Sequence, residues 1–432
     1  MQVKALPGFR DFYPEEFALR RHIVDAWRSV ALRYGFEEYD GPPLESLELY
    51  TVKSGEEIVG QLYNFTDKGG REVALRPEMT PTLARMVAAR ANGLKKPIRW
   101  FSMPQLFRYE RQQRGRLREH FQLNCDLIGE PGPLGDAEII ALAIDVMREL
   151  GLGARDVRVR VSDRRMLTVM LGEMGFDERH HPLAYQLLDK SGRGEGGKLR
   201  TALLEAGATE SAIRRLEEVK ELRTWSDVEA GYPLAAGAGA PLAQVFAALE
   251  RMDLGDFLDL DCTIVRGLAY YTGTVFELFD AGYSLRAICG GGRYDNLLQA
   301  LGGVDLPALG FGMGDVVLGE LLKERGLVPP YAERLDVFLA GATSDDHPHL
   351  PGLAHRLRDA GLRVEFALGE SGLGKQLKLA DARGARFAVL IGPDDRARGE
   401  VVVKDLTSGA QESVGQAALP SMLRDRLAAD TK

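Results

Sequence analysis

The stretch Pro97–Gly129, PIRWFSMPQLFRYERQQRGRLREHFQLNCDLIG, decides the fold expected for this chain. Its two ends contain the aromatic and apolar residues that favour strands, and the polar centre RYERQQRGRLR joins them. That centre carries five arginines and one glutamate, although the whole chain has a net charge of −8. Guanidinium groups match the geometry of phosphate oxygens. The arginines at the two strand ends, Arg108 and Arg118, therefore favour phosphate binding over a solvated hairpin tip.

The second of these strands has a polar face. With the period of two of a strand, Gln122, Asn124 and Asp126 share one face, and apolar residues such as Leu123 and Leu127 share the other. The pattern fits the wall of a polar pocket and a solvent-facing strand equally, so the residues alone leave both interpretations open.

Three further segments carry residues that a plain core element does not need. VRGLAYYTGTVFEL, Val265–Leu278, puts an arginine and two tyrosines at the entrance of a predicted strand. A buried arginine without a partner is costly, so this segment predicts an anionic or strongly hydrogen-bonding ligand. CGGGRYDNLL, Cys289–Leu298, has three glycines that let the backbone approach a ligand or a neighbour closely. In LRPEMT, Thr80 as a helix N-cap and Glu78 beside the helix dipole are the simplest interpretation.

The composition limits the class of protein. The 432 residues suggest about three folding units, and 45% hydrophobic and 27% charged residues are ordinary for a globular protein. The acidic net charge gives no general attraction for nucleic acid, so any such contact must use a local patch. Three cysteines without CxxC spacing indicate a reduced, cytoplasmic compartment. A signal-peptide pattern, an apolar run of membrane length, a metal-binding histidine pattern, and the motifs GxxxxGKS/T and GxSxG are all absent from the sequence.

The order of predicted elements suggests two domains and an insertion. Residues 163–259 are mostly helical in pattern, whereas CTIV, GTVFELFD and YSLRAICGGG after them are predicted strands. The proline-bearing segment LVPPYAERL is a predicted linker. Beyond it, four short apolar strands alternate with three helices, which predicts a compact α/β domain with a partly parallel sheet.

Taken together, these segments resemble a class II aminoacyl-tRNA synthetase, and the histidyl-tRNA synthetase family in particular. FRYERQQRGRLREHFQ resembles motif 2 of that class, and YDGPPLE resembles motif 1 with Pro42 as its proline. VRGLAYYTG and GGGRYD resemble the two histidine-specific signatures, and LGKQLKLADARGARFAVLIG resembles the anticodon-binding domain. The similarity covers nearly the whole chain, in the right order.

The resemblance implies an α+β fold in two parts. The first is a class II catalytic domain over residues 1–325, built on an antiparallel sheet of about six strands with a helical insertion at about 163–259. The second is a C-terminal α/β anticodon-binding domain over residues 331–432.

The resemblance also implies an activity and its partners. A histidine–tRNA ligase uses ATP with Mg²⁺ to convert histidine to histidyl-adenylate, and then transfers the histidyl group to tRNA(His). The family implies a cytoplasmic homodimer that does not bind membranes. The alternative is a non-catalytic paralogue, the regulatory subunit of ATP phosphoribosyltransferase. That subunit shares the fold and binds histidine, but it lacks the anticodon-binding domain.

Carried over residue by residue, the resemblance assigns the histidine site. Arg108 and Arg266 are the predicted catalytic residues, both near the α-phosphate, with Arg266 also facing the carboxylate of histidine. Asp126 and Tyr271 are expected to bind the two imidazole nitrogens. The full set predicted to bind histidine is Glu78, Thr80, Gln122, Asp126, Tyr270 and Tyr271, with Glu78, Thr80 and Gln122 on the α-ammonium group.

The resemblance assigns the nucleotide end to the hairpin. Gln113 matches the position that contacts the tRNA acceptor end, and no residue is predicted to bind a metal ion. The residues predicted to bind ATP are Arg108, Glu110, Arg116, Arg118 and His120.

Two positions depart from the family pattern in ways that matter for ATP. His120 stands where an aromatic residue usually stacks on adenine. GFGMGDVVLGELL places Asp315, Val316 and Val317 where motif 3 commonly has Gly-x-Glu-Arg, so the arginine that clamps the ATP tail is absent. This absence favours the regulatory-subunit alternative. In a ligase, Arg116 is predicted to reach the pyrophosphate end instead, and Asp315 either starts a helix or favours a metal ion near the phosphates.

Overall fold

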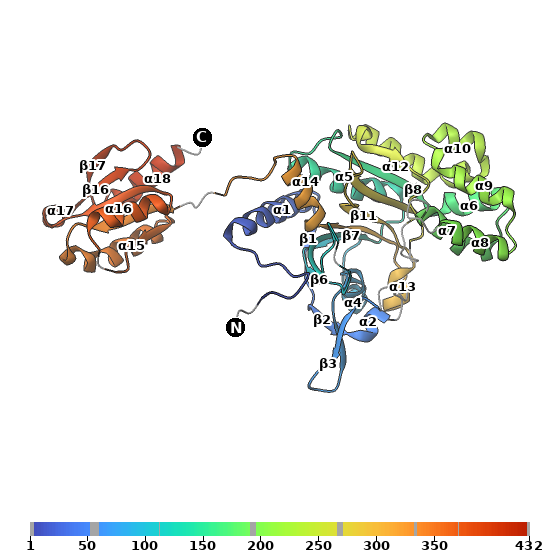
Figure 1. The fold of residues 1–432 in the computed structure, drawn as a ribbon, viewed down its shortest axis with the longest axis horizontal. Coiled ribbons are helices and arrows are strands. Elements are labelled where there is room, and N and C mark those ends of the chain that lie inside the picture. Colours follow the sequence, from blue (N-terminus) through green and yellow to red (C-terminus); the bar gives the residue numbers. More distant parts are fainter. Residues whose placement is uncertain are drawn as a thin grey trace. The chain divides into compact units, whose positions relative to one another are not determined.

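The computed structural model describes residues 4–51, 60–111, 113–190, 196–265, 271–331, 335–369 and 371–429 (Figure 1). The chain divides into two compact units, Met1–Pro329 and Pro330–Lys432. Each unit has a hydrophobic core of its own, and the boundary between them falls in the proline-bearing segment LVPPYAERL.

A large sheet organises the first unit. Among the described residues its strands follow the order β1-β5-β7-β12-β11-β10-β8-β9, with β6 beside β7. From β5 to β8 in this order every neighbouring pair is antiparallel, and the edge pairs β1–β5 and β8–β9 are parallel. The predicted antiparallel sheet is therefore confirmed. The strands are β1 (Glu37–Glu38), β5 (Ile98–Ser102), β6 (Gln105–Phe107), β7 (Glu119–Ile128), β8 (Val157–Asp163), β9 (Leu258–Leu260), β10 (Thr274–Asp280), β11 (Cys289–Arg293) and β12 (Ala308–Gly314).

The alternation of β7 sets which face of the sheet is the core. Leu123, Cys125 and Leu127 lie in the main core, which also contains Trp27 and Ile140. The helices that pack over this face are α1 (Pro14–Arg33), α5 (Pro133–Glu149) and α14 (Asp315–Glu324). A smaller cluster on the other face includes residues of α4 (Thr80–Arg90) and α13 (Leu297–Gly302). The polar residues of β7 therefore point away from the main core.

A second, small sheet stands apart from the large one. The strands β2 (Leu44–Ser46), β4 (Glu72–Leu75) and β3 (Tyr63–Thr66) pair antiparallel, next to the short helix α2 (Leu47–Thr51). Gly70 has φ of 77° in the turn between β3 and β4, which explains why the turn carries a glycine.

Helices fill the chain between β8 and β9. The group starts where the Asp163 carboxylate accepts hydrogen bonds from the backbone N–H groups of Arg165 and Met166, an N-cap for α6. It comprises α6 (Arg164–Met174), α7 (His181–Lys190), α8 (Gly196–Glu205), α9 (Glu210–Glu218), α10 (Trp225–Gly231), α11 (Pro233–Ala238) and α12 (Ala240–Arg251), with short 3₁₀ turns at Glu178–His180, Val219–Glu221 and Gly255–Phe257.

The prediction of a strand at CTIV, Cys262–Val265, is wrong. The strand of this region is β9, which ends at Leu260, before Cys262. Asp261 then turns the chain, because its Oδ1 accepts hydrogen bonds from the backbone N–H of Thr263 over 2.9 Å and from its hydroxyl over 2.6 Å. An aspartate that bonds its own neighbouring backbone competes with strand pairing.

The second unit is an α/β domain with a mixed sheet. Its strand order is β14-β13-β15-β16-β17, parallel as far as β15 and antiparallel beyond it. This confirms the partly parallel sheet. The strands are β13 (Leu335–Gly341), β14 (Val364–Phe366), β15 (Ala385–Ile391), β16 (Glu400–Asp405) and β17 (Gln411–Gly415). The helices are α15 (Leu350–Asp359), α16 (Leu373–Ala382), α17 (Pro393–Arg398) and α18 (Leu419–Ala429), with a 3₁₀ turn at Ser344–His349.

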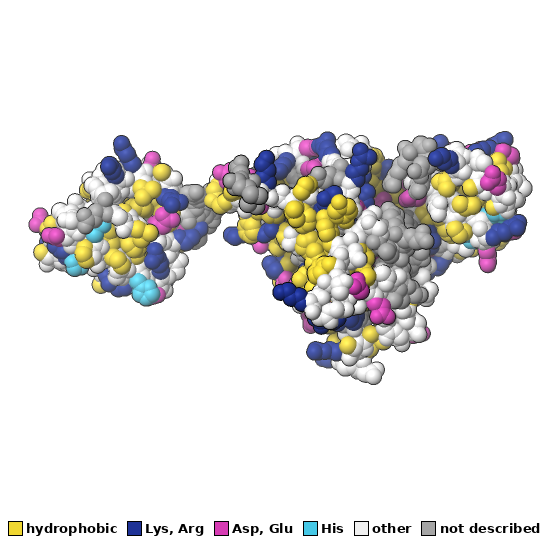
Figure 2. Space-filling model, turned by 60° about the horizontal axis from the view of Figure 1, so that its bottom comes forward, with side chains coloured by type: hydrophobic (Ala, Val, Ile, Leu, Met, Phe, Trp, Pro, Cys, Tyr) yellow, Lys and Arg dark blue, Asp and Glu magenta, His cyan; other side chains and the backbone are white. Residues whose placement is uncertain are grey.

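Two properties of the surface bear on partners. In the described segments, no helix is both long and apolar enough to cross a membrane. Large hydrophobic side chains that remain exposed on the first unit include Leu6, Tyr13, Leu44 and Phe65. Figure 2 shows hydrophobic side chains gathered on one face of this unit.

Candidate active site

The arginine-rich stretch forms the predicted hairpin between β6 and β7. Arg108 directly follows β6 and Arg118 directly precedes β7, and the backbone N–H of Arg108 donates to the carbonyl of Arg118 over 2.9 Å. Inside the loop, the Arg116 guanidinium forms a short ion pair with the buried carboxylate of Glu110. The backbone of two paired strand ends therefore fixes Arg108 and Arg118.

Arg108 joins this hairpin to the segment RPEM. Its Nε donates to the carbonyl of Pro77 over 2.9 Å, directly before Glu78. Burial raises the pKa of the Glu78 carboxyl group, and the nearby charge of Arg108 opposes that rise. Arg76 anchors the segment, because its Nη1 donates to Asp40 Oδ1 over 2.7 Å. The Glu78 carboxyl group and the Arg108 guanidinium, from separate segments, thus lie near each other beyond the end of β6.

The helix that follows this segment begins one residue earlier than a Thr80 cap would require. Thr80 is the first residue of α4, and Met79 occupies the N-cap without a side-chain cap bond. The interpretation of Thr80 as an N-cap is therefore wrong. Pro81 supports the first turn instead, as proline does at the start of helices.

The middle of β7 lies beside two glycines of β12. Asn124 is 6% exposed and Asp126 is 4% exposed, so the interpretation of this face as solvent-facing is wrong. A Cβ atom on Gly310 would lie 2.4 Å from Asp126 Oδ1, and one on Gly312 would lie 2.7 Å from Gln122 Cδ. Larger residues at these glycines would displace the two polar side chains, so the glycines set the positions of Gln122 and Asp126.

Asp126 has a partner that sequence reasoning missed. The hydroxyl of Tyr294, within GGGRYD, donates a short hydrogen bond to Asp126 Oδ1. Burial raises the pKa of Asp126 to about 7, although the bond from Tyr294 favours the ionised form and opposes the rise. In the sequence, the glycines of GGGRYD predict a close approach of the backbone, but no local pattern assigns its tyrosine to Asp126.

Two more polar groups lie on this side of the sheet. In β5, Trp100 pairs with Asp126 and Ser102 pairs with Asn124. Tyr39 packs on Trp100, with ring centroids 5.4 Å apart. Burial raises the pKa of the Tyr39 hydroxyl, and a hydrogen bond with Ser102 opposes that rise. These two buried hydroxyl groups therefore add polar groups to the surroundings of Asp126 and Asn124.

Tyr271 lies against Gly292 of β11. It is 8% exposed and belongs to the same apolar cluster as Tyr294. A Cβ atom on Gly292 would lie 3.0 Å from Tyr271 Cδ1 and 2.5 Å from the carbonyl oxygen of Thr274. The structure therefore brings Tyr271 and the Asp126–Tyr294 pair to one cluster, as the role predicted for Tyr271 requires.

His120 is a neutral ring on β7, the strand that also carries Gln122 and Asp126. Its pKa is lowered to about 3 by burial and by the positive charges of Arg108 and Arg10. The imidazole therefore carries no charge at physiological pH, and a neutral flat ring is suited to stacking on a base.

Arg118 is covered by the start of the chain. Its guanidinium carbon lies 4.1 Å from the Tyr109 ring centroid, and its Nε donates to the carbonyl of Glu110 over 3.3 Å. The backbone of Gly8, with φ of 87°, passes close to the Arg118 side chain, so that a Cβ atom on Gly8 would lie 2.7 Å from Arg118 Cγ. The predicted ATP-binding Arg118 is thus fixed by packing as well as by its strand.

Asp315 forms hydrogen bonds at the start of α14. It is the first residue of α14, and its carboxylate accepts hydrogen bonds from Arg10 Nη1 and from the backbone N–H of Phe121, each over 2.9 Å. The explanation of Asp315 as a helix-start acid is therefore confirmed. Because both oxygens have these partners, a role for Asp315 beside phosphate-bound metal is not supported by its position.

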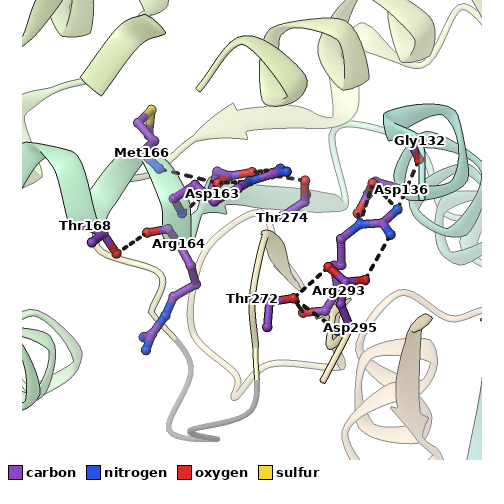
Figure 3. A network of polar contacts seen from close by, with 11 residues as sticks. Gly132, Asp136, Asp163, Arg164, Met166, Thr168, Thr272, Thr274, Arg293 and Asp295 are labelled. Carbon is purple, nitrogen blue, oxygen red and sulfur yellow. Dashed lines mark hydrogen bonds and ion pairs between the residues drawn. The ribbon is translucent and has the colours of Figure 1, made fainter. Parts of the chain in front are cut away.

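Arg266 and Tyr270 lie outside the described residues. The described residue before them, Val265, offers its carbonyl to Arg164 Nη1 over 3.3 Å. Figure 3 shows the Arg164 side chain pointing away from the polar network around Arg293.

That network fixes the chain directly after Tyr271. The hydroxyl of Thr272 donates to Asp295 over 3.0 Å, and its backbone N–H donates to the carbonyl of Arg293 over 2.8 Å. Arg293 forms ion pairs with Asp295 at 3.2 Å and with Asp136 at 2.7 Å (Figure 3). The segment GGGRYD therefore positions the end of VRGLAYYTG.

The antiparallel sheet and its arginine-flanked hairpin form the arrangement expected of a class II aminoacyl-tRNA synthetase. Residues 8–314 match the family model described as Histidyl-tRNA synthetase, and residues 338–426 match that of an Anticodon binding domain. The Histidine–tRNA ligase of Opitutus terrae is 44% identical to this chain over 99% of both. The chloroplastic/mitochondrial Histidine–tRNA ligase of Arabidopsis thaliana is 40% identical over 96% of this chain and 85% of its own length.

A solved structure agrees with these relatives. The crystal structure of histidyl-tRNA synthetase from Nostoc sp. superposes with a TM-score of 0.80 at 26% identity, over 99% of this chain and 100% of that one. The chain belongs to the histidyl-tRNA synthetase family. The predicted fold class, a class II catalytic part with a C-terminal anticodon-binding domain, is confirmed.

Proposed function

We propose that this chain is a histidine–tRNA ligase, which forms histidyl-adenylate and pyrophosphate from histidine and ATP and then transfers the histidyl group to tRNA(His). The observation that carries the proposal is the buried Asp126 carboxylate beside Gly310, with a hydrogen bond from Tyr294. An ionised carboxylate accepts the N–H of an imidazole. Because burial raises the pKa of Asp126 to about 7, such a donor would favour the ionised form.

In the proposed adenylation step, a carboxylate oxygen of histidine attacks the α-phosphorus of ATP. The bond to the bridging oxygen breaks, and pyrophosphate leaves with the electron pair. Arg108 and Arg266 would stabilise the charge that develops, while Glu78, Thr80 and Gln122 would hold the α-ammonium group. The contact of Arg108 with the residue before Glu78 supports this arrangement. Positioning, rather than a covalent enzyme intermediate, would carry the reaction.

The other predicted residues divide between adenine, phosphates, imidazole and tRNA. His120 would stack on adenine as a neutral ring, with Glu110 near the same base. Tyr270 and Tyr271 would border the imidazole. Arg116 and Arg118 would serve the nucleotide end, and the exposed Gln113 would meet the tRNA acceptor end.

Magnesium would enter with the nucleotide. In the described ranges, no group of three or more His, Cys, Asp or Glu side chains is arranged to hold a metal ion. Mg²⁺ usually keeps several waters and binds through substrate phosphates with one or two carboxylates. We therefore propose Mg²⁺–ATP as the substrate complex, without a metal site built by the protein alone.

ATP–pyrophosphate exchange with each amino acid tests the activity. Exchange that requires histidine supports the ligase. No exchange at any ATP concentration, in protein that still binds histidine, would instead favour the non-catalytic regulatory-subunit alternative. The match of residues 338–426 to an anticodon-binding domain supports the ligase, because the regulatory subunit lacks that domain.

We also propose a division of labour between a catalytic domain at 1–325 and an anticodon-binding domain at 331–432. Removing Pro330–Lys432 is expected to leave pyrophosphate exchange within about threefold of the full chain and to lower kcat/KM for tRNA by about 10²-fold or more. The reason is that the first unit has its own core, whereas the removed unit would supply only tRNA contacts. Loss of exchange in a truncated protein that stays folded and dimeric would contradict this division.

We further propose that the chain works as a homodimer in the cytoplasm. The hydrophobic side chains gathered on one face of the first unit support a dimer interface, because contiguous exposed apolar patches mark interaction sites. Cysteine usage without paired spacing supports a reducing compartment. Sedimentation equilibrium of the full chain measures the oligomeric state directly.

A further inference from the structure

The tip of the β6–β7 loop meets helix α14 at the position where the family's motif 3 arginine is missing. A Cβ atom on Gly115, which has φ of 72°, would lie 3.2 Å from Val317 Cγ2 and 3.9 Å from Arg286 Cδ. The stem of Arg286 therefore passes the same point of the loop as Val317. Arg286 comes from the segment between β10 and β11, whereas Gly115 lies in the β6–β7 loop and Val317 in α14.

The neighbouring Arg114 contacts α14 through exposed ion pairs. Its guanidinium forms ion pairs with Glu320 at 3.4 Å and with Glu324 at 2.6 Å, both on α14. The charge of Arg114 is thus balanced by two carboxylates, and its role in the loop is structural.

Arg286 differs from Arg10, Arg114 and Arg116, whose guanidinium groups form ion pairs with carboxylates. Its Nη2 donates to Gln113 Oε1 over 2.5 Å, and its guanidinium forms no ion pair with any carboxylate of the described residues. Arg286 is exposed, and a neutral amide leaves its charge uncompensated. A guanidinium has five N–H donors, so most of them remain available to an anion.

We propose that Arg286 binds the β- and γ-phosphates of ATP and takes over the task that Val317 cannot perform. This inference rests on the proposed function and adds a residue to it. The planar fork of arginine binds two phosphate oxygens at once. When the α-phosphorus bond to the bridging oxygen breaks, pyrophosphate carries away the electron pair. The guanidinium of Arg286 stabilises that charge on the leaving group. The guanidinium of Arg116 is paired with the carboxylate of Glu110, so it is less available to the β- and γ-phosphates than that of Arg286.

The test compares Arg286→Ala with Arg286→Lys and with the control Arg114→Ala. In histidine-dependent exchange, R286A is expected to raise the KM for ATP and for pyrophosphate by roughly 10- to 100-fold, the range for one lost charge-assisted contact. R286K should recover part of the loss, because lysine keeps the charge without the fork. R114A should change either constant less than about threefold, because its ion pairs lie at an exposed position and such surface pairs contribute little.

A second measurement separates phosphate binding from loop packing. A histidyl-sulfamoyl-adenosine analogue keeps the adenosine and the histidyl group but has no β- or γ-phosphate. R286A should bind this analogue and histidine as tightly as the unaltered protein does. Equal losses for ATP and for the analogue, or an R114A defect as large as that of R286A, would overturn the proposal and leave only a packing role. If the unaltered protein shows no exchange at all, the proposed function fails instead, and the two failures are distinguished.

Discussion

Replacement of Asp126 by alanine is expected to raise the KM for histidine by about 10³-fold or more, while the KM for ATP changes less than about threefold. Asp126 is 4% exposed, and its Oδ1 accepts a hydrogen bond from the Tyr294 hydroxyl. Without the carboxylate, both that hydroxyl and an imidazole N–H would be buried without a partner, which is the costly case for polar groups. Pyrophosphate exchange, titrated separately with each substrate, measures both constants.

Asp126→Asn is the matched control for this change, because it keeps the size of the side chain. The folded protein holds the pKa of Asp126 at about 7, above the ordinary value of a carboxyl in an unfolded chain. Ionisation therefore lowers the free energy of unfolding above pH 7, and this loss disappears as the pH falls toward about 4. D126N should be at least as stable as the unaltered protein at about pH 8, yet still bind histidine weakly. Equal rises in both Michaelis constants would remove Asp126 from the histidine site.

The hairpin and the polar face of β7 could be predicted because their signals are local. Arg108 and Arg118 flank the loop at neighbouring strand ends, and the period of two of one strand already placed Gln122 and Asp126 together. The sequence left open whether that face was buried. The answer depends on Gly310 and Gly312 of β12, which no local pattern assigns to that neighbour.

Other features depended on partners that lie far apart in the sequence. Tyr294 reaches Asp126 across 168 positions, and Arg286 reaches Gln113 across 173. Contacts at such separations follow from strand order, which the sequence alone did not supply. The unpredicted strand β17, QESVG, lies at the sheet edge, where β16 is its one partner among the described strands, and it is largely exposed. It therefore lacks the apolar alternation by which strands are recognised.

Arg293→Ala is expected to lower the free energy of unfolding of the first unit by about 3–5 kcal/mol, because it leaves a buried carboxylate without its partner. The side chains of Arg293 and Asp136 are 3% and 4% exposed, and their ion pair is 2.7 Å long. Arg293 also donates to the carbonyls of Glu130 and Gly132 over 2.9 and 3.0 Å. Urea denaturation followed by fluorescence measures the loss.

The surface pair of Arg325 and Asp156 is the matched control for this loss. It is 2.9 Å long with side chains 35% and 30% exposed, so Arg325→Ala should lower the free energy of unfolding by less than about 1 kcal/mol. Burial already raises the pKa of Asp136, and Arg293 opposes the rise. Without Arg293 that pKa rises further, so the destabilisation is full at high pH and shrinks as falling pH protonates Asp136. A loss in R293A that matches R325A, or one that does not shrink at low pH, would show that the buried pair does not hold GGGRYD in place.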